Sequence, residues 1–301
     1  MTKLAIITVH FHKPEDTQAL LESLSKCKVA KDLQVTILVV DNGGGSCLRL
    51  DKYSNVKCLG NGVNLGFTGG NNLGISFAIN NNFDYCLLLN NDTEVDSLFY
   101  QAISHSLAQN PNVGAIGALI YFAAGYEFHH HYQKNELGQV IWYAGGKFDK
   151  NNVLGSHAHV DEVDQGQFTK SFSTDFITGA CLLVSTKVIK KVGLLDERYF
   201  MYLEDLEYSL RIQQAGFQLI VDPNIKLHHK VASSSGIGSN LNDYFITRNR
   251  LILGFTYSSF RTKFALLREA FRKILIGTPT SRLAVIDFVT GKLGKGSYIK
   301  T

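Results

Sequence analysis

Short apolar runs alternate along this chain with segments in which apolar residues recur at helical spacing. A short, continuous apolar run is typical of a strand buried on both faces, as in a parallel sheet. The runs that predict such strands are residues 4–9, 35–40, 56–59, 86–89, 113–121, 176–184 and 219–222. Together with the intervening helical segments they predict an α/β fold with a mostly parallel central sheet flanked by helices.

Helix signals fall between these runs. Pro14 suits the first position of a helix, and Glu15 and Asp16 follow it in the first turn. Further helices are predicted over residues 75–80, 96–110, 186–192 and 203–215, and from Tyr244 the chain turns helical and basic. We expect one compact domain with a helical C-terminal appendage.

The run at residues 86–89 ends abruptly in Asn90-Asn91-Asp92. Polar side chains at the carboxyl end of a buried strand lie where open α/β sheets bind their ligands. A carboxylate there has the chemistry to hold Mg²⁺ or Mn²⁺ against a diphosphate. By itself the motif is equally typical of a polar turn.

Residues 61–74 are rich in glycine and asparagine and lead into the helix predicted at 75–80. Glycines before a helix allow a ligand to approach the backbone closely, and the helix N-terminus favours an anion. The spacing matches neither the dinucleotide-binding nor the P-loop motif. A glycine-rich connection without a ligand is the alternative interpretation.

Glu204 and Asp205 fall in the first turn of another predicted helix. One interpretation is that they only complement the helix dipole. The dipole also predicts that Asp205 stays ionised at neutral pH, ready to accept a proton.

Composition narrows the class of protein. The 301 residues contain five cysteines and no C-x-x-C pair, which argues against a disulfide framework and for a reducing cytoplasm. The apolar run at residues 4–9 is too short for a signal-peptide core, and residues 115–124 are too short to span a membrane.

Charge is distributed unevenly. Residues 247–301 carry eleven Lys or Arg against Glu269 and Asp287, a balance of +9, so residues 1–246 carry −5 of the net +4. A basic tail on an acidic body predicts an anionic partner surface. A nucleic acid is disfavoured because no recognition motif accompanies the basic residues.

Part of this tail has the pattern of an amphipathic helix. Its apolar residues recur at spacings of three and four: Phe264, Leu267, Phe271, Ile274 and Leu275. With basic residues around them, they predict peripheral attachment to the cytoplasmic face of the inner membrane. Packing of this face on the body, or on a second subunit in a homodimer, is the alternative.

Several motifs together carry a resemblance that covers nearly the whole chain. They are Val40-Asp41-Asn42, Asn64-Leu65-Gly66-Phe67, Gly69-Gly70-Asn71-Asn72, Leu88-Leu89-Asn90-Asn91-Asp92, Thr178-Gly179-Ala180-Cys181, Glu204-Asp205, His229-Lys230 and Arg248-Asn249-Arg250. In this order the motifs resemble family-2 glycosyltransferases of the GT-A fold, in particular the rhamnosyltransferase-like branch that builds bacterial surface polysaccharides such as O-antigen or capsule.

The resemblance implies a role for each matched position. Asp205 would be the catalytic base, Asp92 would bind Mg²⁺ or Mn²⁺ on the diphosphate, and His229 would be a further metal or diphosphate contact. Binding of the nucleotide sugar is implied for Thr8, Asp41, Asn64, Gly66, Asn71, Asn90, Asp92 and Arg250. The implied domains are a catalytic domain over 1–245, with a nucleotide-sugar part to about residue 125, and a basic helical segment over 246–301.

One departure from the family pattern concerns the metal. The usual D-x-D motif reads Asn90-Asn91-Asp92 here, so we expect weaker metal binding that depends more on the oxygens of the diphosphate. The variant is familiar in the rhamnosyltransferase-like branch, and we do not interpret it as inactivation.

The implied activity is inverting transfer of L-rhamnose from dTDP-L-rhamnose to a growing surface polysaccharide or a lipid-linked saccharide. A UDP-hexose donor is the alternative within this class. A nucleotidyltransferase would need a glycine-rich, arginine-containing loop after the first strand, where this chain has His10-Phe11-His12-Lys13-Pro14. A catalytically inactive scaffold that binds nucleotide sugars is the remaining alternative.

Overall fold

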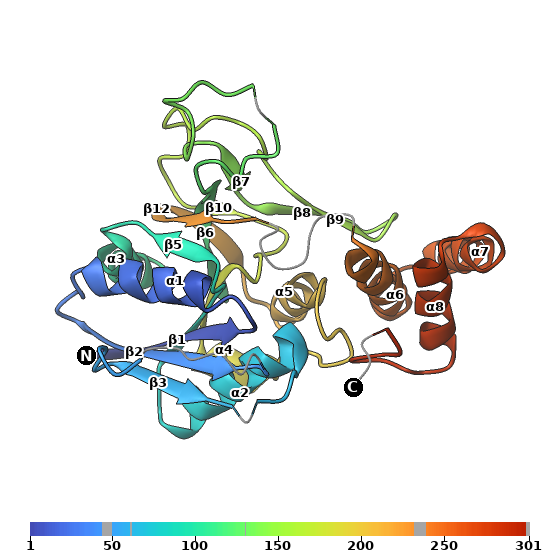
Figure 1. Ribbon diagram of the computed structural model, residues 1–301, viewed down its shortest axis with the longest axis horizontal. Coiled ribbons are helices and arrows are strands. Elements are labelled where there is room, and N and C mark those ends of the chain that lie inside the picture. Colours follow the sequence, from blue (N-terminus) through green and yellow to red (C-terminus); the bar gives the residue numbers. More distant parts are fainter. Residues whose placement is uncertain (44–49, 61, 130, 232–238, 299–301) are drawn as a thin grey trace.

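A ten-stranded mixed sheet forms the centre of the computed structural model, which describes residues 1–43, 50–60, 62–129, 131–231 and 239–298 (Figure 1). The longer strands are β1 (Thr2–His10), β2 (Leu33–Asp41), β3 (Val56–Leu59), β4 (Tyr85–Leu89), β6 (Ala115–Phe122), β11 (Cys181–Ser185) and β12 (Leu219–His229). The short strands are β5 (Thr93–Val95), β7 (Ile141–Tyr143) and β10 (Phe172–Ser173). The spatial order is β10-β12-β6-β11-β4-β1-β2-β3, with β5 beside β12 and β7 beside β6.

The predicted parallel core of the sheet is confirmed. β1 is parallel to β2 and β4, β2 is parallel to β3, and β12 is parallel to β6. The central strand β11 is antiparallel to both of its neighbours, β4 and β6. Because β1, β2, β4, β6 and β12 point in the same direction, their carboxyl ends lie along one edge of the sheet.

Helices cover both faces of the sheet. α1 (Pro14–Lys26) and α3 (Phe99–Gln109) pack on one face, and α2 (Gly66–Asn80), α4 (Thr186–Val192) and α5 (Glu204–Gln214) pack on the other (Figure 1). Successive side chains of a strand point to opposite faces, so a wholly apolar strand serves both layers. In β4, Leu87 and Leu89 join the core under α1 and α3, and Cys86 and Leu88 join the core under α2 and α4.

Helix α2 differs from the sequence-based prediction, because it begins at Gly66 and not at residue 75. The glycines expected in a connection therefore lie in the helix, which packs close to β1. A Cβ atom on Gly74 would lie 2.4 Å from Cγ2 of Ile7, and one on Gly70 would lie 3.0 Å from Cγ1 of Val9. These glycines thus permit the helix to approach a neighbouring strand closely.

Strands β12 and β11 also have limits other than those predicted. β12 continues beyond Asp222 to His229, because an irregularity in its register with β6 between Asp222 and Lys226 accommodates Pro223. β11 starts only at Cys181, so residues 176–180 precede the strand. The longer β12 carries His229 to the edge at which β6 ends.

The C-terminal part of the described chain forms α6 (Asn240–Tyr257), α7 (Phe260–Ile276) and α8 (Pro279–Val289), which lie together at one end of the molecule (Figure 1). Ser239, Ser259 and Thr278 cap these helices, each through a side-chain oxygen that accepts a backbone N–H three residues later. The boundary predicted between residues 245 and 246 falls inside α6, and the division into domains stays a prediction.

Helix α6 connects the C-terminal helices to the rest of the molecule. Its Leu251 shares a core with Tyr199 and Leu206, and with Val153 in the turn between β8 (Gly146–Asp149) and β9 (Leu154–His157). α7 packs through Thr262, Leu266 and Ala270. Across the described residues, the helices are too short or too polar for any one of them to span a membrane.

Candidate active site

Many of the predicted site residues lie at the sheet edge where the parallel strands end. Asp41 ends β2, Asn90 directly follows β4, and His229 ends β12. Thr8 lies two residues before the end of β1, where His10 is in register with Asp41. Open α/β sheets bind ligands at an edge of this kind.

Asp92 and His229 form a buried pair at this edge. β5 and β12 pair with Thr93 opposite His229, which brings the preceding Asp92 to the imidazole. His229 Nε2 lies 3.0 Å from Oδ1 of Asp92, and both side chains are buried. Trp142 also contacts the imidazole of His229 edge to face, with ring centroids 4.4 Å apart. The structure thus brings together the two residues predicted as metal ligands.

The chemistry of this pair fits a divalent cation that is bound jointly with a diphosphate. His229 Nδ1 is buried and lacks a hydrogen-bond partner among the described residues, so it is available to a ligand. A carboxylate and an imidazole are suitable donors for Mn²⁺. The described residues contain no cluster of three or more His, Cys, Asp or Glu that could hold a metal ion. The remaining ligands would have to come from the diphosphate and water.

Asp205 lies in the first turn of α5, as predicted, and two backbone groups fix its carboxylate. Oδ2 accepts a hydrogen bond from the Gly179 N–H at 2.9 Å, and Oδ1 accepts one from the Leu206 N–H at 2.8 Å. A side chain on Gly179 would collide with Phe67 in the first turn of α2, since its Cβ would lie 2.9 Å from Cζ of Phe67. The Asn90 N–H donates to the Ala180 carbonyl, which links this region to the end of β4.

The pKa of Asp205 differs from the sequence-based prediction. We expected the helix dipole to favour its charge, yet burial is the larger effect and raises the pKa of Asp205 above its ordinary value. The hydrogen bonds from Gly179 and Leu206 oppose this rise, because they stabilise the carboxylate. A carboxylate with a raised pKa is a stronger proton acceptor, which suits a general base.

The neighbouring Glu204 is more deeply buried and lacks the same support. Its Oε2 atom has no hydrogen-bond partner among the residues that the structure describes. Burial raises its pKa well above the ordinary value, and the negative charge of Asp205 raises it further. Glu204 is therefore the carboxyl of this pair that holds its proton more readily.

The start of α2 is braced by side-chain amides. The Oδ1 of Asn42 accepts the Leu65 N–H at 2.7 Å, and its Nδ2 donates to the Gly66 carbonyl at 3.0 Å. Asn64 Oδ1 accepts the Gly66 N–H at 2.9 Å. Asn64 and Gly66 were predicted to bind the nucleotide sugar, and the structure shows them building the turn that starts α2.

Two buried hydroxyl groups, one on each of two elements that reach the site, have no hydrogen-bond partner among the described residues. They belong to Thr8 on β1 and Thr68 in the first turn of α2. Buried polar groups in proteins are normally paired, so such atoms mark places where a ligand would complete the bonding. Thr8 was predicted from the family pattern, whereas nothing in the sequence singled out Thr68.

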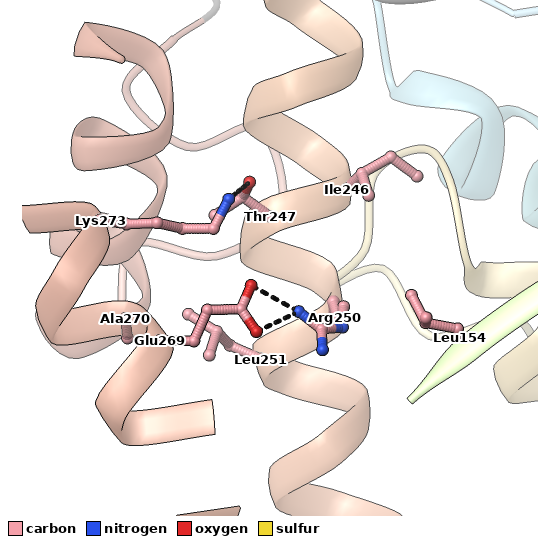
Figure 2. Close-up of a pocket in the computed structure, with 8 residues that line it drawn as sticks. All are labelled: Leu154, Ile246, Thr247, Arg250, Leu251, Glu269, Ala270 and Lys273. Carbon is pink, nitrogen blue, oxygen red and sulfur yellow. Dashed lines mark hydrogen bonds and ion pairs between the residues drawn. The ribbon is translucent and has the colours of Figure 1, made fainter. Parts of the chain in front are cut away.

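Two other predicted residues have structural partners. Asn71 is buried, and its Nδ2 donates to the Phe67 carbonyl within α2. Arg250 lies in a pocket between α6 and α7, where Nη1 bonds both carboxylate oxygens of Glu269 at 2.7 Å (Figure 2). Its Nη2 also donates to the Asn152 carbonyl at 2.8 Å. The described contacts of Arg250 thus join α7 to the turn after β8, and its role in nucleotide binding stays a prediction.

Sequence reasoning missed a chain of polar contacts behind the site. His10 Nδ1 lies 2.8 Å from Oγ1 of Thr17 in α1, and Asn91 Nδ2 donates to the same oxygen at 3.0 Å. These contacts tie β1, α1 and the turn after β4 together. Sequence spacing carries no signal for them, because Asn91 lies 74 residues from Thr17.

The architecture is the GT-A fold, which the chain shares with solved structures of glycosyltransferases. One similar solved structure is that of GalNAc-T7 with UDP, GalNAc and Mn²⁺. The alignment has a TM-score of 0.60 and 15% sequence identity, and it covers 96% of this chain and 58% of GalNAc-T7. The chain aligns similarly with Staphylococcus aureus TarS 1-349, at a TM-score of 0.55 and 12% identity, covering 96% of this chain and 79% of that one. At such identities the likeness shows the fold alone.

The family follows from the sequence comparison. The family model described as Glycosyl transferase family 2 matches residues 5–193, which is more than half of the chain. The chain therefore belongs to glycosyl transferase family 2, and the predicted resemblance is confirmed.

Relatives with assigned names support the same family. The N-acetylglucosaminyl-diphospho-decaprenol L-rhamnosyltransferase of Mycobacterium tuberculosis (strain ATCC 25618 / H37Rv) is 26% identical over 245 residues, covering 77% of this chain and 78% of the relative. The low-salt glycan biosynthesis hexosyltransferase Agl10 of Haloferax volcanii is 25% identical over 259 residues, covering 83% of this chain and 74% of the relative.

The buried Glu204 predicts a pH-dependent effect on stability. A carboxyl whose pKa is higher in the folded than in the unfolded state destabilises the fold as pH rises through that interval. Glu204→Gln removes this effect and should stabilise the protein by about 1–3 kcal/mol at about pH 8, with little change at about pH 4. Melting temperatures at the two pH values provide the measurement. The exposed Glu15→Gln is the control, and an equal effect of Glu204→Gln at both pH values would contradict the assignment.

Proposed function

We propose that this protein transfers L-rhamnose from dTDP-L-rhamnose to a saccharide acceptor, with inversion at the anomeric carbon. The observation that carries the proposal is the placement of a braced, half-buried Asp205 at the sheet edge that also holds the Asp92–His229 pair. The donor sugar is inferred from the rhamnosyltransferase relative, which covers 77% of this chain. That relative's name includes a diphospho-decaprenol-linked sugar, which favours a lipid-linked saccharide as the acceptor here.

Asp205 would act as the general base. The acceptor oxygen forms a bond to the anomeric carbon, the bond from that carbon to the diphosphate oxygen breaks with its electron pair, and the acceptor proton passes to Asp205. We expect inversion because this displacement takes place in one step, without a covalent intermediate between the sugar and the enzyme. Glu204 is a poor nucleophile, since burial and Asp205 raise its pKa well above the ordinary value and favour its neutral form.

The donor's diphosphate would lie between Asp92, His229 and the start of α2. The dipole of α2 favours an anion near its first turn, where the buried Thr68 hydroxyl has no hydrogen-bond partner among the described residues. Asp92 and His229 would hold Mg²⁺ or Mn²⁺, which when bound neutralises the charge that develops on the leaving diphosphate.

Donor hydrolysis by the purified protein tests the proposal, because it requires no particular acceptor. We expect turnover of dTDP-L-rhamnose in the presence of Mg²⁺ or Mn²⁺, and little turnover of UDP-glucose or UDP-galactose. Turnover of a UDP-hexose without turnover of dTDP-L-rhamnose would overturn the donor. Nucleotide-sugar binding, seen as a raised melting temperature, without turnover of any donor would favour the scaffold.

Asp92 and Asp205 should differ in what their loss removes. Asp92→Ala should weaken binding of the donor in the presence of metal, because it removes a ligand of the cation. Asp205→Asn should leave donor binding nearly intact and lower kcat by about 100-fold or more, because a proton acceptor acts in the transition state. Donor titrations and initial rates separate the two effects. Asp51→Asn, at an exposed position, is the control. Near-normal turnover by Asp205→Asn would show that another group is the base.

We propose further that α7 attaches the enzyme to an anionic membrane surface. Phe260, Phe264, Leu267, Phe271 and Leu275 recur at spacings of four and three, and each is 49–84% exposed. They therefore form a stripe that faces away from Thr262, Leu266 and Ala270, through which the helix packs. Ile274 was predicted to lie on the same face of the helix. In the structure it packs against the core that contains Leu251 and Leu266.

Charge favours a lipid surface as the partner of this stripe. Arg261, Arg268 and Arg272 each directly follow a stripe residue, so all three lie on one flank of it, and all three are exposed. A helix with an apolar stripe and flanking arginines suits the interface of an anionic bilayer. Each basic residue near such a leaflet contributes about 1 kcal/mol to binding.

Vesicle sedimentation measures this attachment. The protein should sediment with anionic vesicles at low salt and be released at high salt. Replacing Arg261, Arg268 and Arg272 by Gln should weaken binding by about 100-fold, from three contributions of this size. The control replaces Lys26, Lys28 and Lys31, exposed at the end of α1, by Gln. Equal binding to neutral and anionic vesicles, or binding to neither, would contradict the proposal. It would favour the alternative that the stripe packs against a second subunit.

A further inference from the structure

The loop at residues 199–203, just before α5, has an unusual backbone. Phe200, Tyr202 and Leu203 have φ values of 63°, 68° and 67°, in the left-handed region. Residues other than glycine avoid this region, and such conformations persist only where the surrounding structure holds them. The loop therefore needs an external support.

The support comes from Asn249 in α6. Asn249 is fully buried, and its Nδ2 lies 2.9 Å from the Tyr199 carbonyl, 2.8 Å from the Met201 carbonyl and 2.8 Å from the Tyr202 carbonyl. The two N–H groups of one amide nitrogen are thus shared among three carbonyl oxygens of a strained loop. Its Oδ1 accepts a bond from Arg248 Nε at 3.2 Å, which orients the amide.

Arg248 extends the same support. It is fully buried, and its Nη2 donates to the Tyr199 carbonyl at 3.2 Å and to the Arg198 carbonyl at 3.3 Å. Its guanidinium lies over the rings of Tyr244 and Phe245. The Tyr244 hydroxyl in turn donates to Asp287 of α8. The loop is therefore connected to the C-terminal helices by a buried polar network.

The other side of the loop contacts the first turn of α2 and leads directly into the first turn of α5. The Thr68 N–H, in the first turn of α2, donates to the Phe200 carbonyl at 3.1 Å. At the loop's end Leu203 immediately precedes Glu204 and Asp205, and its carbonyl accepts the Glu207 N–H at 2.9 Å. A shift of the loop would consequently move the first turn of α5.

We propose that Asn249 is a positioning residue, which holds the 199–203 loop so that the Asp205 carboxylate stays on the Gly179 N–H and faces the reacting centre. The inference rests on the proposed role of Asp205 as the base. An amide is suited to this position because it donates hydrogen bonds without bringing a charge into the core. Aspartate has nearly the same shape but, when ionised, has no donor for the three carbonyls.

The proposal predicts a change in pH dependence that a purely structural residue would not cause. The Gly179 and Leu206 N–H groups stabilise the Asp205 carboxylate, so loosening the first turn of α5 should raise the pKa of Asp205 further. The other titratable groups around it are Glu204 on the same helix and Tyr143 of β7. Burial raises the pKa of both, so both hold their protons more readily than Asp205, and the ionisation of Asp205 contributes to the acid limb of kcat.

The test is Asn249→Asp in the full chain, with donor hydrolysis measured across pH. We expect kcat to fall by about 100-fold, as a small misplacement of a reacting group can cause. The acid limb of the kcat profile should move to higher pH. KM for the donor should stay within about threefold, because Asn42 and Asn64 brace the start of α2 independently. Asn240→Asp makes the same chemical change at an exposed position of α6 and is the matched control.

Amide hydrogen exchange of the same proteins gives a second measurement that does not depend on activity. Faster exchange at residues 199–207 in Asn249→Asp than in Asn240→Asp supports the proposal. If Asn249→Asp fails to fold, Asn249→Gln keeps the amide and should fold, with kcat below that of the unmodified protein and the acid limb at higher pH.

The outcomes separate this inference from the proposed function. Unchanged kcat, acid limb and exchange in folded Asn249→Asp would overturn it. A lower kcat with the acid limb and exchange unchanged would overturn it equally, since the residue would then not act through the loop. If the unmodified protein turns over no donor, the proposed function fails, and the exchange data still decide whether Asn249 holds the loop.

Discussion

Burial of polar and charged groups at one edge of the sheet is the constraint on which this structure depends. Each such group must find a partner, since an unpaired buried polar atom is costly. Asp92 is paired by His229, 137 residues away, and Asp205 is paired by the backbone of Gly179. The long strand β12 and the late start of β11 bring these partners to the edge. His229 Nδ1 and the Thr8 hydroxyl have no partner within the part of the chain that the structure describes, and a ligand would complete their bonding.

The C-terminal helices present two surfaces of opposite character. The buried surface of α6 includes the polar residues Arg248 and Asn249, which bind carbonyl groups of the loop before α5. The outer surface of α7 is apolar and exposed, with Phe260 and Phe271 on it. α6 therefore links the loop before α5 to the C-terminal helices. It supplies part of the support for the residue at the start of α5.

The two levels of similarity to other proteins have a common physical basis. Structures of 12–15% identity share the fold, because a buried sheet and its helices tolerate many apolar sequences of similar pattern. Specificity for a donor and an acceptor depends instead on individual polar contacts at the edge, which the fold does not dictate. The pairing of Asp92 with His229 is one polar contact at this edge that joins residues far apart in the chain.

The sequence by itself determined the longer strands and most of the helices, though not the limits of α2, β11 and β12, because apolar runs and helix signals such as Pro14 report local burial and local backbone preference. It also determined the candidate residues Asp92, Asp205 and His229 through motif order. Only the tertiary structure decided that Gly74 serves packing against Ile7, that burial outweighs the dipole at Asp205, and that Arg250 pairs with Glu269. The reason is that close approach, desolvation and pairing depend on residues distant in the chain, and the spacing of residues along a sequence carries no record of those distances.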